Sequence, residues 1–378
     1  MHVLLDAHLA VKKIDGVARH IRGLLSELPA LDRSIRYTVL TLPAGKSCLP
    51  PTLAEQPNVS LGELDLRGPS PRQNLIMPRL IREIKPDLYH HPQYDLPLTI
   101  RIPRVVTFHD LKYLFRPDFL EGNSFLKRSY IRWSIAHSLR SADQIISVSE
   151  NTLKDLGKLF TFQDSKVSVI PNGVEPILGD KSSESANKIT LPERYILFVG
   201  TRRPHKNING LIHALKVVRV KFDLPIELVI AGKAYADYRD PEKTASDTGM
   251  TNFVHFKNFV SDAQLPRLYR KAEAFVLPSF YEGFGIPLIE AMANKTPVIG
   301  SDRSSIPEVI GSAGLLVNPE RPDDIADKIF QICTDQKLRQ RLIDAGLERS
   351  RQFSWKRIAE ATLEVYIKAL RKRCRERV

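Results

Sequence analysis

Two glutamates, Glu282 and Glu290, lie eight residues apart around a glycine pair in the stretch 276-VLPSFYEGFGIPLIEAMANKTPVIGSD-302. The stretch begins as an apolar strand, breaks at Gly283 and Gly285, and continues as a helix. Carboxylates accept hydrogen bonds from hydroxyls, so Glu290 could hold a vicinal diol such as a ribose, and Glu282 a further hydroxyl. Glycines let the backbone approach a ligand, and the first N–H groups of a helix attract anions. Stabilisation of the helix end by carboxylates, worth about 0.3–1 kcal/mol, does not explain the glycines. We expect a site for a ligand with hydroxyls and negative charge.

A cationic loop in 198-FVGTRRPHKNING-210 leads from an apolar strand into a helix. Arg202, Arg203 and Lys206 crowd this loop. Cations and the free N–H groups of a helix start both favour a phosphate. A solvated basic loop is the alternative when the segment is taken alone.

Two features of the first half could add to such a site. His109 in 107-TFHD-110 follows a very apolar strand and could bond a sugar hydroxyl or a phosphate, although a structural histidine is the commoner case. Gly16, in the loop 8-HLAVKKIDGVARHI-21, could bring backbone N–H groups to a phosphate, and a plain turn is equally compatible.

Several common nucleotide and metal motifs are missing. The segment 44-AGKS-47 lacks the first glycine of a P-loop, because Leu40 stands at that position. No G-x-G-x-x-G follows a strand, which argues against a dinucleotide fingerprint. No Asp-x-Asp occurs, so a divalent ion held between two aspartates and a diphosphate is not expected. The sequence predicts no metal and no cofactor.

Short apolar runs alternate with amphipathic stretches through most of the chain, which predicts an α/β architecture. Many runs are apolar at nearly every position, as in a parallel sheet covered on both faces. The expected strands are 2–7, 36–42, 87–92, 104–110, 144–149, 166–172, 195–201, 226–232, 253–259, 274–279, 297–302 and 314–319. The expected helices include 17–28, 72–85, 124–140, 150–160 and about 207–222, and 354–378 has the pattern of one long helix.

The polar segment 174–190 has no helix or strand period and predicts a linker. A chain of 378 residues exceeds the usual size of one core, so two doubly wound domains of similar size are expected.

The bulk composition limits the partners. Apolar residues make up 43% and charged residues 26%, which is typical of a globular protein. The net charge of +13 favours an anionic partner, but no motif that reads nucleic acid is present, so nucleic acid is not expected. Three scattered cysteines favour a reducing, cytoplasmic setting. No apolar run approaches the roughly 20 residues that cross a bilayer.

Taken together, these segments resemble glycosyltransferase family 4, the retaining transferases that use nucleotide sugars and have the GT-B fold. The resemblance covers nearly the whole chain, and the stretch 278-PSFYEGFGIPLIEAMA-293 followed by 297-PVIGSDRSSIPEVIGSAGLLVNP-319 is its most specific part. Further marks are Gly16-Val17, 107-TFHDL-111, 147-SVSENTLKDL-156, 169-VIPNGV-174, 199-VGTRRPHKN-207 and 353-FSW-355.

The resemblance implies two Rossmann-like domains that face each other across a cleft. An acceptor-side domain would cover 1–173, a linker 174–190 and a donor-side domain 191–352, and the helix within 353–378 would cross back to the N-terminal domain. Lys206, with Arg202 or Arg203, would hold the donor diphosphate. The family often has its arginine where this chain has Thr201, which leaves open which arginine serves.

The remaining site residues are also implied by the resemblance. Glu290 would bind the ribose and Glu282 the transferred sugar, while His109 would lie near that sugar. Backbone groups near the diphosphate or the sugar would come from Gly16, Gly283, Phe284, Gly285 and Ile286. The expected catalytic residues are thus Lys206, Arg202, Glu282 and His109.

The implied function is retaining transfer of a sugar from a nucleotide diphosphate sugar (GDP-mannose or a UDP-sugar) to a glycan or lipid-linked acceptor, as in synthesis of cell-surface polysaccharide or glycolipid. A non-catalytic or epimerase-type sugar-nucleotide-binding protein of the same fold is the alternative. Eight basic residues against three glutamates in 356–377, with more cations in 67–85 and 124–140, suggest contact with an anionic membrane at the inner, cytoplasmic face, unless these are merely solvated helix faces.

Overall fold

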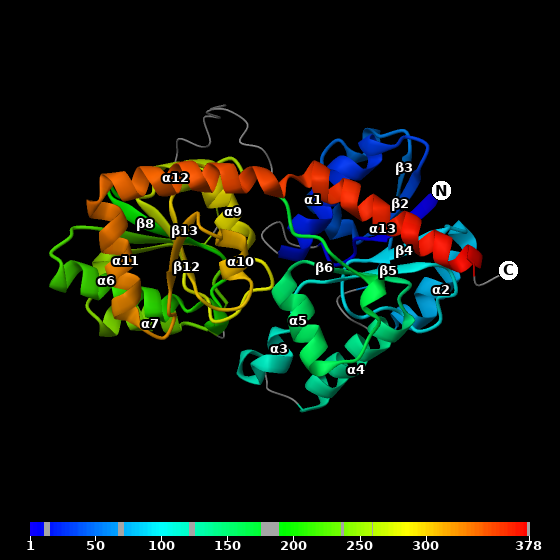
Figure 1. Cartoon of the computed structure of the whole chain (residues 1–378), viewed down its shortest axis with the longest axis horizontal. Helices are drawn as coiled ribbons and strands as arrows, with labels where there is room; N and C mark the ends of the chain where they lie inside the picture. The colour runs from blue at the N-terminus through cyan, green and yellow to red at the C-terminus, as the bar shows by residue number, and fades with distance from the viewer. Residues whose placement is uncertain are drawn as a thin grey trace. The chain divides into compact units, whose positions relative to one another are not determined.

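The computed structural model describes residues 1–10, 16–66, 72–120, 125–174, 189–235, 238–258 and 260–375, with only the backbone of 373–375 (Figure 1). The chain forms two compact units. Unit 1 contains Met1–Gly173 together with Trp355–Val378, and unit 2 contains Val174–Ser354. Most of the segment expected to be a linker, residues 175–188, lies outside the described residues.

Unit 1 is built on a seven-stranded sheet in which every pairing is parallel. Its strand order is β3-β2-β1-β4-β5-β6-β7. The chain adds β2 and β3 on one side of β1, and then adds β4 to β7 on the other side. The strands are β1 (His2–Asp6), β2 (Arg36–Thr41), β3 (Val59–Glu63), β4 (Leu88–His91), β5 (Arg104–Phe108), β6 (Gln144–Ser147) and β7 (Val167–Val169). The direction reverses between β1 and β4, which creates a topological switch point there.

Strand β3 was not predicted from the sequence. It lies at the edge of the sheet and has no fully buried residue, so its sequence VSLGE lacks the continuous apolar run of the inner strands. Exposed polar residues are typical of edge strands, where they discourage pairing with another chain. The other strands of unit 1 appear where the sequence predicts them.

The helices of unit 1 are α1 (Gly16–Leu31), α2 (Gln73–Ile84), α3 (Lys112–Phe115), α4 (Phe125–Ser141), α5 (Glu150–Leu159) and α13 (Trp355–Arg375). Helix α13 comes from the C-terminus and packs alongside α1. Its residues Trp355 and Tyr366 are buried in the core that β1 and α1 share. The Tyr366 hydroxyl lies 2.7 Å from Nδ1 of His90 on β4. The C-terminal helix is therefore part of the N-terminal unit's core.

Unit 2 contains a six-stranded parallel sheet in the order β10-β9-β8-β11-β12-β13. The strands are β8 (Tyr195–Val199), β9 (Glu227–Ala231), β10 (Val254–Lys257), β11 (Ala274–Leu277), β12 (Val298–Ser301) and β13 (Gly314–Val317). The helices are α6 (Ile208–Lys221), α7 (Asp240–Asp247), α8 (Leu265–Lys271), α9 (Ile286–Ala293), α10 (Ile306–Ile310), α11 (Pro322–Thr334) and α12 (Gln336–Ser350). Here the chain reverses between β8 and β11.

The two sheets confirm the predicted α/β class with two doubly wound, parallel halves. Strands β1, β4, β8 and β11 are buried at every residue. The apolar runs of β8 and β11 agree with this burial, whereas β1 and β4 also bury polar residues at their carboxyl ends, namely Asp6, His90 and His91. Ligands of such sheets bind beyond the carboxyl ends of the strands at the switch point. Each unit therefore has its own preferred location for a site.

Among the helices that the structure describes, none has the length and apolar character that spanning a bilayer requires.

The contact between α1 and α13 predicts a specific packing effect. A Cβ added at Gly23 would lie 2.0 Å from Cε2 of the Trp355 indole, so Gly23→Ala must displace the indole. We expect a loss of about 1–3 kcal/mol in the free energy of unfolding, measured by urea denaturation. Gly157→Ala on α5 is the matched control, because no atom lies within 4 Å of its added Cβ. It should stabilise the chain by about 0.5–1 kcal/mol. Equal stability of the two variants would contradict this packing.

Candidate functional site

Lys206 and Glu282 meet at the switch point of unit 2. Lys206 follows β8 and Glu282 follows β11, and Nζ of Lys206 donates to Oε1 of Glu282 at 2.6 Å. The Ser279 hydroxyl donates to the same oxygen at 2.7 Å. The side chains of Lys206 and Glu282 are 13% and 10% exposed, so this pair is largely shielded from water. A cation and a carboxylate that were predicted as site residues are thus brought into direct contact.

The turn between β11 and α9 depends on glycine. Gly285 precedes the first residue of α9 and has φ +99°, in the left-handed region where a side chain is unfavourable. Pro287 lies in the first turn of α9, where its missing N–H is not needed. Helix α9 therefore begins directly after the predicted turn, and its first backbone N–H groups follow Gly283, Phe284 and Gly285.

Two serines that the sequence analysis did not assign hold this turn in place. The backbone N–H of Glu282 donates to the Ser304 hydroxyl at 2.8 Å. The Ser305 hydroxyl lies 3.0 Å from the carbonyl oxygen of Glu282 and 3.1 Å from that of Phe284. Both serines follow β12, the strand beside β11. Their place in the quoted stretch 297–319 was the only sequence signal available.

Glu290 lies on α9, one turn beyond the glycine turn, and is oriented by a buried tyrosine. The Tyr269 hydroxyl on α8 donates to Oε2 of Glu290 at 2.8 Å. Tyr269 also packs edge-on against Phe275 of β11. Tyr269 was not found from the sequence, because a single tyrosine in an amphipathic helix looks like any core residue.

The two arginines of the 198–210 loop have different environments. Arg202 is buried, and its guanidinium donates to Oε1 of Glu242 at 2.6 Å and to Oδ1 of Asn258 at 2.8 Å. Burial lowers the pKa of Arg202 below its ordinary value. Arg203 instead lies over the ring of Tyr235, 3.4 Å from its centroid. Arg202 also lies over the ring of Phe256, 4.5 Å from its centroid. Both guanidiniums therefore stack on aromatic rings, and they differ in that Arg202 is buried against Glu242 and Asn258.

In unit 1, the predicted residues His109 and Gly16 lie beyond carboxyl ends of strands. Nε2 of His109 donates to the carbonyl of Pro92 at 3.1 Å, and its ring lies 4.9 Å from that of His20 in an edge-to-face contact. Gly16 is the first residue of α1 and has open space where a Cβ would be.

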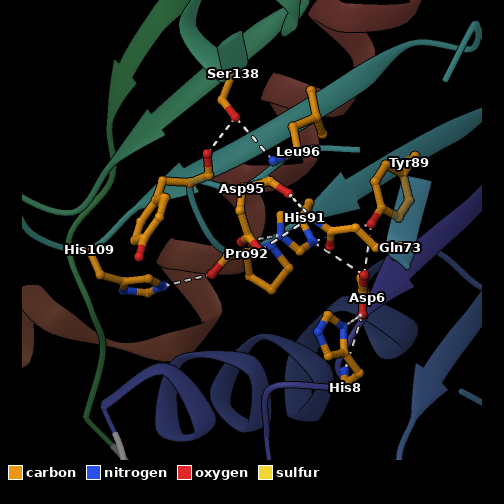
Figure 2. Close-up of polar contacts among 11 residues, drawn as sticks. Asp6, His8, Gln73, Tyr89, His91, Pro92, Asp95, Leu96, His109 and Ser138 are labelled. Atoms are coloured by element: carbon orange, nitrogen blue, oxygen red, sulfur yellow. Dashed lines mark hydrogen bonds and ion pairs between the residues drawn. The ribbon is translucent and has the colours of Figure 1, made fainter. Parts of the chain in front are cut away.

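A buried polar network occupies the switch point of unit 1 (Figure 2). Asp6 ends β1 and His91 ends β4, and Oδ2 of Asp6 accepts from Nδ1 of His91 at 3.2 Å and from the Tyr89 hydroxyl at 2.7 Å. His91 also donates from Nε2 to Oδ1 of Asp95 at 2.9 Å. His8 donates from Nδ1 to Oδ1 of Asp6 at 2.5 Å. The sequence analysis did not assign these residues, although polar groups at the ends of two predicted strands were a usable signal.

The charges in this network stabilise each other. Burial alone would lower the pKa of His91, but the hydrogen bonds and charges of Asp6 and Asp95 raise it to about 10. Burial alone would raise the pKa of Asp6, but His8 and His91 hold it well below its usual range. The network therefore contains an imidazolium between two carboxylates at neutral pH. Among the residues that the structure describes, no group of three or more His, Cys, Asp or Glu is arranged to hold a metal ion.

Two sequence families together match most of the chain. Residues 14–177 match the model of Glycosyltransferase Family 4, and residues 180–349 match that of Glycosyl transferases group 1.

Comparison with individual proteins also finds glycosyltransferases. O-antigen chain mannosyltransferase B of Escherichia coli is 31% identical over 294 residues, which cover 76% of this chain and 75% of that protein. O-antigen chain mannosyltransferase RfbU of Salmonella typhimurium is 35% identical over 218 residues, 57% of each chain. The solved structure of Anabaena HepE in complex with UDP and glucose matches with a TM-score of 0.74 at 19% identity over 97% of this chain and 99% of that one, which shows a common fold.

The raised pKa of His91 predicts how stability depends on pH. His91 binds its proton more tightly in the folded than in the unfolded chain, where the pKa is near 6.5. Its contribution is therefore complete below about pH 6.5 and is lost as the pH rises through about 10. We expect the free energy of unfolding to fall between these values, measured by urea denaturation. His91→Gln cannot take up this proton and should show a flatter profile. Parallel profiles for the two proteins would contradict an imidazolium at His91.

Proposed function

The chain belongs to glycosyltransferase family 4 and the group 1 glycosyl transferases, and on that premise we propose that it transfers a mannosyl group from a nucleotide diphosphate sugar to a growing cell-surface glycan or its lipid-linked form. The names of the two O-antigen mannosyltransferases support the sugar and the class of acceptor. We take GDP-mannose as the first donor to test, with UDP-sugars as the other candidates.

The contact between Lys206 and Glu282 carries this proposal. In the chain without ligand, the Lys206 ammonium is neutralised by Glu282 at 2.6 Å. A donor diphosphate would offer Lys206 a stronger anionic partner and would free the Glu282 carboxylate to accept a hydroxyl of the transferred sugar. Lys206 would then bind the departing diphosphate and Glu282 the transferred sugar, on opposite sides of the bond that breaks.

Breaking the sugar–phosphate bond leaves negative charge on the departing diphosphate. Fixed cations and N–H donors at that position stabilise the transition state. Lys206 and the first N–H groups of α9, around Phe284, Gly285 and Ile286, would supply them. In this proposal no metal ion is needed, and the acceptor attacks on the face that the diphosphate leaves, so that the configuration is retained. The leaving phosphate would take the acceptor's proton.

The other residues of unit 2 take supporting roles in the proposal. Glu290, held by Tyr269, would accept the ribose hydroxyls. Arg203, which is partly exposed, would contact the diphosphate, and the buried Arg202 would fix the loop through Glu242 and Asn258. In unit 1, Gly16 and His109 stay candidates for contact with the diphosphate and the transferred sugar, respectively.

We also propose that α4 binds an anionic membrane surface at the cytoplasmic side, where a lipid-linked acceptor would be held. Phe125, Leu126 and Trp133 on this helix are 78%, 77% and 48% exposed. Basic residues share the helix, namely Lys127, Arg128, Arg132 and Arg140. Apolar and aromatic side chains insert at the lipid interface, and each nearby cation adds about 1 kcal/mol on an anionic surface.

Replacing Lys206 tests the proposed function. Lys206→Met should lower turnover of GDP-mannose at least about a hundredfold, because one fixed charge is lost where the diphosphate gains charge. Release of nucleoside diphosphate in the presence of an acceptor glycan is the measurement. Lys216→Met, at an exposed position on α6, is the control and should keep the wild-type rate. Wild-type turnover by Lys206→Met would refute the proposal, and binding without turnover by the wild type would indicate a non-catalytic protein.

Vesicle binding tests the membrane proposal. Phe125→Ser combined with Leu126→Ser should weaken sedimentation with vesicles of phosphatidylglycerol and phosphatidylcholine by about tenfold, because two apolar side chains leave the lipid interface. Val220→Ser is the control, since Val220 is 72% exposed but lies on α6 in unit 2. Binding that is the same on pure phosphatidylcholine, or unaffected by the double substitution, would rule out this surface.

A further inference from the structure

His8 is held rigidly at the end of β1. It follows Asp6 in a turn closed by the Ala10 N–H, which donates to the Ala7 carbonyl at 3.0 Å. The backbone N–H and Nδ1 of His8 both donate to Oδ1 of Asp6, at 3.2 and 2.5 Å. Only 1% of His8 is exposed. The orientation of the imidazole is thus fixed by two bonds to one carboxylate oxygen (Figure 2).

Among the residues that the structure describes, the other ring nitrogen of His8 has no partner. An ionised carboxylate only accepts hydrogen bonds, so Nδ1 of His8 carries a hydrogen. The buried Nε2 makes no hydrogen bond to any described residue. By contrast, His91 uses both ring nitrogens, on Asp6 and Asp95, and His90 uses both, on Tyr366 and Thr107. A buried polar atom without a partner costs free energy that a ligand can recover.

The hydrogen bonds around Asp6 hold its carboxylate in one orientation. Oδ2 of Asp6 accepts from Tyr89 and His91 while Oδ1 accepts from His8, so the carboxylate cannot rotate without losing several bonds. Asp6 and His91 end neighbouring strands that the sheet holds in register. Such support of a binding group by fixed neighbours is typical of functional sites.

The location agrees with the topology. The chain reverses between β1 and β4 in unit 1, as it does between β8 and β11 in unit 2. Lys206 and Glu282 lie at the second reversal, and Asp6, His8 and His91 lie at the first. Ligands of doubly wound sheets bind at such reversals.

We propose that Nε2 of His8 binds a hydroxyl of the carbohydrate acceptor, with Asp6 as the positioning residue. This inference rests on the proposed function, since it assigns an acceptor contact to the same reaction. A neutral hydroxyl fits better than an anion, because the Asp6 carboxylate lies directly against the ring of His8. A hydroxyl can both donate and accept a hydrogen bond, so it can pair with Nε2 and with a further group.

The test uses the full-length chain with ¹⁵N-labelled histidine rings. Methyl α-D-mannopyranoside and a panel of α-linked mannobiosides are titrated, and the His8 Nε2 resonance is assigned by its loss in His8→Gln. We expect one of these saccharides to shift this resonance, and His8→Gln to weaken its binding about five- to tenfold, as for one lost hydrogen bond. His213→Gln, at an exposed position on α6 in unit 2, is the matched control, because it makes the same substitution outside the network around Asp6. It should bind within about twofold of the wild type.

Two further measurements complete the test. Thermal unfolding of each variant shows whether it is folded, and GDP affinity by calorimetry should be the same in His8→Gln as in the wild type. Equal saccharide affinity in folded His8→Gln, or no saccharide in the panel that shifts the resonance, overturns the proposal. If the wild type shows no nucleotide binding or no turnover, the proposed function is contradicted instead. The saccharide titration would still decide the role of His8.

Discussion

In each parallel sheet, the direction in which successive strands are added reverses at one point, and this brings segments that are distant in the sequence together. The same constraint organises both units. In unit 2 it joins Lys206 to Glu282 although 76 residues separate them. In unit 1 it joins Asp6 to His91 across 85 residues. The backbone hydrogen bonds of the inner strands fix these ends, so the side chains that follow them have little freedom. A doubly wound sheet thus supplies a rigid edge on which polar groups can be held at bonding distance.

The two sites use this edge differently. The pair in unit 2 is simple, because one ammonium and one carboxylate satisfy each other, and in our proposal a donor diphosphate takes the place of the carboxylate. The network in unit 1 is interlocked, because His91 bonds both Asp6 and Asp95 and Tyr89 completes the bonding of Asp6 Oδ2. A labile ion pair suits a charged ligand that must leave again. A locked network suits a neutral ligand that is recognised by the direction of one hydrogen bond.

Supporting residues were harder to predict than the residues they support. Glu282, Glu290 and Lys206 stood out because charged residues beside glycines and after apolar strands are unusual. Ser304 and Ser305 did not, since serines are common in loops and their bonds to Glu282 span 22 and 23 residues of sequence. Arg202 and Arg203 look equivalent as neighbours, and only the packing of Glu242 and Asn258 around the first guanidinium distinguishes them.

The sequence by itself determined the class of fold, the positions of nearly all strands and the segments that belong to the family, because these follow from local periodicity and short motifs. It did not determine the edge strand β3, whose residues are too exposed to form an apolar run. Which side chains touch was decided only by the tertiary structure, since pairing across a sheet depends on strand order and register. The buried histidines show this most clearly. His8, His90 and His91 look alike in the chain, and only the folded environment satisfies both nitrogens of His90 and His91 while no described residue bonds Nε2 of His8.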